Sequence, residues 1–170
     1  MAGPIYMSSY LSDTTLGIGD GTFQPQQSFP ILQPSTLAVG DFNGDGKVDL
    51  VAGSYYQPEA SVLLGRGDGT FQPKVDYGLP DQTASIVVAD FNADGVPDLA
   101  LGEEFLASPN SFIPSVIVLL NKGDGTFQSQ KTYASDYGDS YLAVGDLDGD
   151  GVPDIASFMD KVPLTCCSIV

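Results

Sequence analysis

The chain has 170 residues, 42% of them hydrophobic, and its 22 acidic residues against 6 basic ones give a net charge of −16. This balance, without a basic stripe, argues against a nucleic-acid partner, and the absence of histidine excludes His-based triads and imidazole acid–base chemistry. The sequence shows no apolar run long enough for a membrane-spanning helix and no signal-peptide pattern.

The first thirty residues have strand-like segments at 4–10 and 14–29, and the second contains the motif GDGTFQ at 19–24. Asp-Gly between strand-like segments is a signal for a two-residue β-hairpin turn. We expect the phenylalanine that follows to begin the next strand with a buried ring. Because the motif returns at 67–72 and 123–128, the sequence predicts three such hairpins.

The next feature is an acidic loop, DFNGDGKVD, at residues 41–49, between the short apolar runs 37–40 and 50–53. Short apolar runs bounded by Gly and Asp are typical of buried strands, so the loop is expected to cap a β-hairpin. Ca²⁺ binds about six to eight oxygen ligands. Side-chain oxygens at positions 1, 3 and 5 of the loop, the carbonyl at position 7 and both oxygens of the carboxylate at position 9 can converge on one ion. Glycine at position 6 permits the sharp reversal that this requires.

The acidic loop recurs at residues 90–98 and 146–154. Three copies in register favour metal binding over the alternative of ordinary Asp/Asn/Gly turns. The first two loops carry three carboxylates each and the third carries four, and ligand charge tunes affinity, so we expect the third loop to bind Ca²⁺ most tightly. Mg²⁺ is less suitable because it prefers octahedral sites that keep several waters.

The acidic loops and the GDGTFQ motifs share a period of about fifty residues, which predicts a repeat architecture. Each unit reads as four antiparallel strands, the pattern of a propeller blade, and residues 103–114 read as a loop insertion in one unit. The predicted class is therefore all-β, with β-propeller-type blades and about three blades' worth of chain. The expected division is a partial blade of later strands at 1–30, complete blades at 35–80 and 83–134, a partial blade at 140–158, and an unmatched tail without a third strand at 159–170.

The segments VGDFNGDGKVDLVAG, VADFNADGVPDLALG and VGDLDGDGVPDIAS, together with the GDGTFQ turns, resemble FG-GAP (integrin-alpha-type) repeats, which in bacteria are often grouped with VCBS repeats. The resemblance covers about residues 16–158. It implies a β-propeller with Ca²⁺ in the hairpin between the first two strands of a blade, and up to three ions in this chain. The ligands that it implies, with backbone carbonyls at position 7, are Asp41, Asn43, Asp45, Lys47 and Asp49; Asp90, Asn92, Asp94, Val96 and Asp98; and Asp146, Asp148, Asp150, Val152 and Asp154.

Closed propellers have about four to eight blades, more than this chain supplies. We therefore expect a fragment, a truncated product, or a part that closes its ring by self-association or with blades from elsewhere. Mutual completion of the two partial blades in a small ring is the less favoured alternative.

The resemblance also implies a non-catalytic module, extracellular or at the cell surface, that binds a protein or carbohydrate ligand. Two alternatives are a structural spacer in a larger secreted surface protein and part of a carbohydrate-active enzyme. For an enzyme, Glu103-Glu104 is the spare acidic pair outside the loops. The tyrosines in or near predicted blade loops suit sugar stacking or partner anchoring, although half-buried strand packing is the commoner case; they are Tyr55, Tyr56, Tyr77, Tyr133, Tyr137 and Tyr141.

Overall fold

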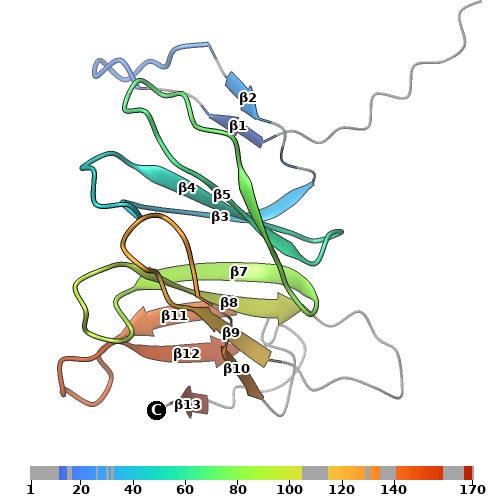
Figure 1. Ribbon diagram of the computed structural model, residues 1–170, viewed down its shortest axis with the longest axis vertical. Coiled ribbons are helices and arrows are strands. Elements are labelled where there is room, and N and C mark those ends of the chain that lie inside the picture. Colours follow the sequence, from blue (N-terminus) through green and yellow to red (C-terminus); the bar gives the residue numbers. More distant parts are fainter. Residues whose placement is uncertain are drawn as a thin grey trace, which may run out of the picture.

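The computed structural model describes residues 12–14, 17–25, 27–29, 31, 33–104, 115–128, 131–134, 141–158 and 167–169. Every regular element in this part of the chain is a β-strand, which confirms the predicted all-β class. The strands form antiparallel sheets that are stacked in chain order as an open series, not a closed ring (Figure 1). No helix that could span a membrane occurs among these residues. Residues 105–114 of the predicted insertion and 159–166 of the predicted tail lie outside the described ranges.

Two four-stranded meanders form the middle of the stack, and each follows the order of the sequence. The first contains β3 (Pro34–Gly40), β4 (Asp49–Ser54), β5 (Glu59–Leu63) and β6 (Val75–Gly78). The second contains β7 (Gln82–Ala89), β8 (Asp98–Glu104), β9 (Ser115–Leu119) and β10 (Lys131–Ala134). Each has the topology of a propeller blade, as the period predicts.

A smaller sheet lies at each end of the stack. One pairs β1 (Ser12–Thr14) with β2 (Gln27–Phe29), and the other contains β11 (Tyr141–Gly145), β12 (Asp154–Phe158) and β13 (Cys167–Ile169). The prediction that no third strand follows residue 158 is wrong, because β13 pairs antiparallel with β12. This strand is only three residues long and has no acidic loop or GDGTFQ motif beside it, so its sequence carried no signal.

The GDGTFQ turns also differ from the two-residue hairpins that the sequence predicts. In each, the phenylalanine forms an isolated β-bridge six residues back, as between Gly65 and Phe71. The amide of the residue after the bridge donates to the threonine carbonyl, Arg66 N to Thr70 O at 2.9 Å, which leaves a three-residue Gly-Asp-Gly loop. Both glycines of this loop have positive φ, so the Gly-x-Gly spacing fixes a wider turn than Asp-Gly alone would.

The hydrophobic core is divided into clusters that lie between consecutive sheets, because alternate residues of a strand point to opposite faces. In β4, Val51 packs in the cluster toward the β7–β10 sheet, whereas Leu50 and Ala52 pack toward β1–β2. In β8, Leu99 belongs to the cluster with the β3–β6 sheet. Ala100 belongs to the cluster shared with β12.

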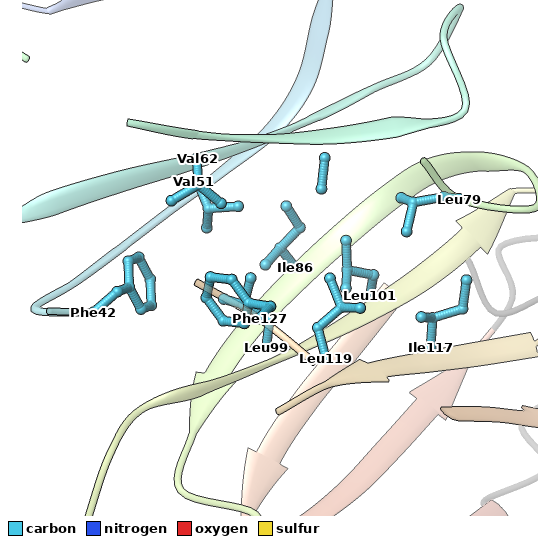
Figure 2. Close-up of a cluster of buried hydrophobic side chains, with 11 residues drawn as sticks. Phe42, Val51, Val62, Leu79, Ile86, Leu99, Leu101, Ile117, Leu119 and Phe127 are labelled. Carbon is cyan, nitrogen blue, oxygen red and sulfur yellow. The ribbon is translucent and has the colours of Figure 1, made fainter. Parts of the chain in front are cut away.

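The largest cluster of buried side chains among the described residues lies between the β3–β6 and β7–β10 sheets (Figure 2). At its loop end, Phe42 is fully buried and meets Phe127 edge to face at a centroid distance of 5.8 Å. Tyr77 contacts the same ring at 5.5 Å, and its hydroxyl accepts the Phe127 amide at 3.2 Å. The 121–127 hairpin is thereby fixed against the preceding sheet.

Gly53, which ends the apolar run after the first acidic loop, has a packing explanation. A Cβ at this position would lie 2.7 Å from the Cβ of Thr83 in β7, which is closer than atoms of two side chains can approach. The glycine is therefore required by the neighbouring sheet rather than by its own strand.

Candidate metal centres

The acidic loops connect the first two strands of their sheets, as predicted. Position 1 follows directly after β3, β7 or β11, and position 9 is the first residue of β4, β8 or β12. The glycine at position 6 has φ of 77°, 85° and 90° in the three loops, which confirms the reversal expected from the sequence. Position 4 is also left-handed, even where it is Ala93 with φ of 57°.

The same five hydrogen bonds, between 2.7 and 3.1 Å, hold every loop. The side chain at position 1 accepts the amides of positions 5 and 6, and the side chain at position 3 accepts the amide of position 5. Position 5 accepts the amide of position 7, and position 9 accepts the amide of position 2. The predicted ligand side chains at positions 1, 3, 5 and 9 are thus held within one compact turn in each loop.

The third loop brings its carboxylates closest together. Asp146, Asp148 and Asp154 offer oxygen atoms that all lie within 4.8 Å of one another. This set of hard anionic oxygens suits Ca²⁺ better than a metal that prefers nitrogen or sulfur ligands. Asp150 belongs to the same turn through its hydrogen bonds to Asp146, Asp148 and Val152.

The first two loops have Asn43 and Asn92 at position 3, so each offers an amide oxygen where the third has a carboxylate. In the first loop the Lys47 ammonium lies 3.0 Å from Asp45 Oδ2, and this hydrogen bond lowers the pKa of Asp45. The Lys47 side chain offsets part of the negative charge of the first loop. This agrees with the prediction that the first loop binds Ca²⁺ less tightly than the third. The coordinating role of the position 7 carbonyls of Lys47, Val96 and Val152 stays a prediction.

Position 9 has a second role that the sequence did not indicate. Asp49 and Asp98 are fully buried, and each uses one oxygen for the amide of position 2. The other oxygen accepts the amide that begins the hairpin of the same sheet, Gly65 N at 2.7 Å for Asp49 and Asn121 N at 2.8 Å for Asp98. Since a carboxylate has about four lone-pair sites, these bonds leave acceptor capacity for a cation. Burial raises the pKa of Asp98, while the Asn121 and Phe91 amides act in the opposite direction.

Asn121 extends this connection to the neighbouring sheet. Its side-chain amide donates to the carbonyl of Phe42 at 2.9 Å and to that of Pro97 at 3.0 Å. The Gly125 amide donates to the same Phe42 carbonyl at 2.9 Å. Position 2 of the first loop is therefore bonded through its carbonyl to the hairpin of the next sheet.

The two roles of the acidic side chains predict different effects of substitution. Asp98→Asn is expected to lower the free energy of unfolding in chelator by about 1–3 kcal/mol, because one buried backbone amide then faces an NH₂ group. Asp94→Asn, at exposed position 5 of the same loop, is expected to stay within about 0.5 kcal/mol of the parent without metal. Urea unfolding in excess chelator measures both, and equal losses in the two variants would contradict the structural role of Asp98.

Comparisons with known proteins agree with this geometry. A family model described as FG-GAP-like repeat matches residues 41–101 and 104–157, about two thirds of the chain. A search of curated proteins finds no match. Among solved structures, the chain is similar to a lectin of Agrocybe aegerita, described by its specific recognition of non-reducing terminal N-acetylglucosamine, with 26% identity and a TM-score of 0.58. The alignment covers 88% of this chain and 41% of the lectin, so the chain spans less than half of the lectin's length.

Proposed function

Because the chain belongs to the FG-GAP-like repeat family, we propose that it is a non-catalytic, Ca²⁺-binding β-propeller module that binds carbohydrate outside the cytoplasm. The observation that carries the proposal is that three acidic loops share one hydrogen-bond pattern, in a chain similar to a lectin. Positions 1, 3, 5, 7 and 9 of each loop would hold the ion. Bound Ca²⁺ would supply charge neutralisation and hold the loop ends of the sheets together.

A non-catalytic role is supported by the places of the acidic residues. Most lie in the three loops and the GDGTFQ turns, and the chain has no histidine. Of the spare pair, Glu103 is buried, and its Oε1 accepts the Asp81 amide at 2.9 Å. This glutamate therefore has a structural partner, which disfavours the glycosidase alternative.

The best candidate for sugar contact is the loop after β4. Tyr55 and Tyr56 pack edge to face at 5.3 Å, and together with Gln33 and Pro34 they line an open cavity of about 320 Å³. Tyr56 is 61% exposed, so one aromatic face is available for the apolar side of a sugar ring. The Ser54 hydroxyl fixes this loop, since it donates to the Gln33 carbonyl and accepts the Tyr56 amide.

The backbone supports the same location. Gln33 has φ of 47°, a conformation that is costly for a residue with a side chain. Such strain clusters at binding sites, and here it occurs at a residue that lines the same cavity as the tyrosine pair.

A glycan array with the Ca²⁺-loaded protein tests the proposal. We expect binding to glycans that end in N-acetylglucosamine, a loss of about tenfold or more in Tyr56→Ala, and near-parental binding in Tyr56→Phe, which keeps the stacking surface. Failure to bind any glycan in Ca²⁺ would remove the carbohydrate assignment. Equal loss in the Ala and Phe variants would contradict stacking as its basis.

A further inference from the structure

The first two acidic loops differ at position 4, directly after the asparagine at position 3. Asn43 of the first loop is followed by Gly44, and Asn92 of the second is followed by Ala93. An asparagine loses its side-chain amide when the backbone nitrogen of the next residue attacks the side-chain carbonyl carbon. A side chain on that next residue obstructs the attack, so glycine allows the closest approach of the backbone.

The attacking nitrogen of the first loop is not engaged elsewhere. The amides of positions 2, 5, 6 and 7 each donate to a side chain of this loop, whereas no acceptor for the Gly44 amide is found among the described residues. Gly44 is exposed, and no atom beyond its chain neighbours lies within 4 Å of the place that a Cβ would take. In the third loop the equivalent Gly149 amide donates to Asp146 at 2.7 Å. The Gly44 nitrogen is therefore available for reaction.

The carbonyl that it would attack is held and polarised. Asn43 Oδ1 accepts the Asp45 amide at 3.0 Å, which turns the side-chain carbonyl back toward the intervening peptide. Negative charge develops on this oxygen as the Gly44 nitrogen attacks, and the same amide stabilises that charge.

The leaving nitrogen is also held differently in the two loops. In the second loop, Asn92 Nδ2 donates to Asp94 Oδ2 at 2.8 Å. In the first, Asp45 Oδ2 bonds the Lys47 ammonium at 3.0 Å instead, and no partner of Asn43 Nδ2 is found in the described part of the chain. Departure of the Asn43 nitrogen therefore breaks no hydrogen bond of the kind that holds Asn92.

We propose that Asn43 is a site of spontaneous deamidation in the folded protein. The Gly44 nitrogen bonds to Asn43 Cγ as the Cγ–Nδ2 bond breaks, and the proton displaced from Gly44 leaves with Nδ2 as ammonia. Water then opens the resulting succinimide. Cleavage at the side-chain carbonyl gives aspartate, and cleavage at the backbone carbonyl gives isoaspartate, in which the main chain runs through Cβ.

The two products change the first loop in opposite ways. Aspartate gives it a fourth carboxylate, in the pattern that Asp146, Asp148 and Asp150 already have in the third loop, and so favours tighter Ca²⁺ binding. Isoaspartate adds a methylene to the main chain between positions 3 and 4. The amides of positions 5 to 7 then no longer match the side chains that accept them. Deamidation itself does not rest on the proposed function, whereas its effect on metal affinity does.

Mass spectrometry of peptides from the 170-residue chain tests the proposal, after incubation in chelator and mildly alkaline buffer. Asn43 is expected to deamidate at least about tenfold faster than Asn92, which serves as the control within the same molecule. The chain unfolded in urea gives the rate that local sequence sets alone. An Asn43 that stays intact in the folded chain while it reacts in urea would overturn the proposal.

Exchange of the two neighbouring residues separates the glycine from the rest of the loop. Both loops accommodate either residue, since Gly44 has φ of 69° and Ala93 has φ of 57°. Gly44→Ala is expected to slow the reaction at Asn43 by about tenfold or more, and Ala93→Gly to accelerate it at Asn92 by a similar factor. Unchanged rates in the two variants would show that the Asn43–Gly44 pair is not the basis of the reaction, and the proposal would be wrong.

Addition of Ca²⁺ distinguishes deamidation from metal binding. Excess Ca²⁺ is expected to slow deamidation of Asn43 by about tenfold or more, because an ion that coordinates Oδ1 holds the side chain in place. Deamidation that proceeds in chelator and is unaffected by Ca²⁺ would support the reaction and contradict metal binding by the first loop. Calorimetric titration of Asn43→Asp, which reproduces the aspartate product, is expected to show tighter Ca²⁺ binding than the parent.

Discussion

Removal of Ca²⁺ is expected to lower the melting temperature by about 15–30 °C. Each loop filled at a hundred times its dissociation constant adds about 2.7 kcal/mol to the free energy of unfolding. Three loops therefore add about 8 kcal/mol, and for a chain of this size each kcal/mol corresponds to about 2–4 °C. The physical reason is the repulsion among three or four carboxylates held in one turn, as at Asp146, Asp148 and Asp154.

Thermal unfolding followed by circular dichroism, with excess Ca²⁺ or with chelator, measures this effect. Mg²⁺ at the same concentration is the ionic control and should restore little of the loss. Asp68→Asn, in a GDGTFQ turn outside the acidic loops, should respond to Ca²⁺ like the parent. A melting temperature that chelator leaves unchanged would contradict metal binding by the loops.

The Phe42→Ala variant is expected to lose about 3–5 kcal/mol of unfolding free energy, the usual cost of emptying a buried phenylalanine site. Phe42 has no exposed surface, and its ring fills the loop end of the largest core cluster against Phe127 (Figure 2). The loss should appear with and without Ca²⁺, because the ring contributes packing rather than metal ligation.

Leu147→Ala is the matched control, since Leu147 has the same position 2 in the third acidic loop but is 63% exposed. Its loss should stay below about 0.5 kcal/mol. Urea unfolding of both variants, with the wild type as reference, gives the comparison. Similar losses at the two positions would show that position 2 acts through the loop itself rather than through the interface between sheets.

The sequence predicted those features that local chemistry determines. The identical spacing of acidic residues and glycine in three loops predicted that each loop caps a β-hairpin. The period of about fifty residues predicted the four-stranded sheets. Gly46 and Gly95 could be assigned to a reversal because few other residues tolerate that backbone conformation. The family resemblance, which rests on the same residues, is confirmed by the family model.

Features that depend on a neighbouring sheet could not be predicted in this way. The GDGTFQ motif predicts a buried ring in all three copies, and for Phe23, which is 66% exposed, this prediction is wrong. Phe127 is buried because Phe42 and Tyr77 of the preceding sheet cover its ring, a contact that the motif itself does not encode. Asp49 and Asp98 look like metal ligands in sequence, and their bonds to Gly65 and Asn121 appear only once two distant hairpins meet. β13 was missed because its pairing with β12, rather than its own composition, makes it a strand.

The division of the core between consecutive sheets has a consequence for how such chains can change in length. In the part of the chain that the structure describes, the apolar clusters lie between consecutive units. Stability in such an array is close to a sum of unit terms and nearest-neighbour interface terms. Duplication of one fifty-residue unit would add one sheet and one interface of a kind already present, and would require no new packing solution elsewhere. The fold can therefore grow or shorten by whole units, while the chemistry of each acidic loop stays the same.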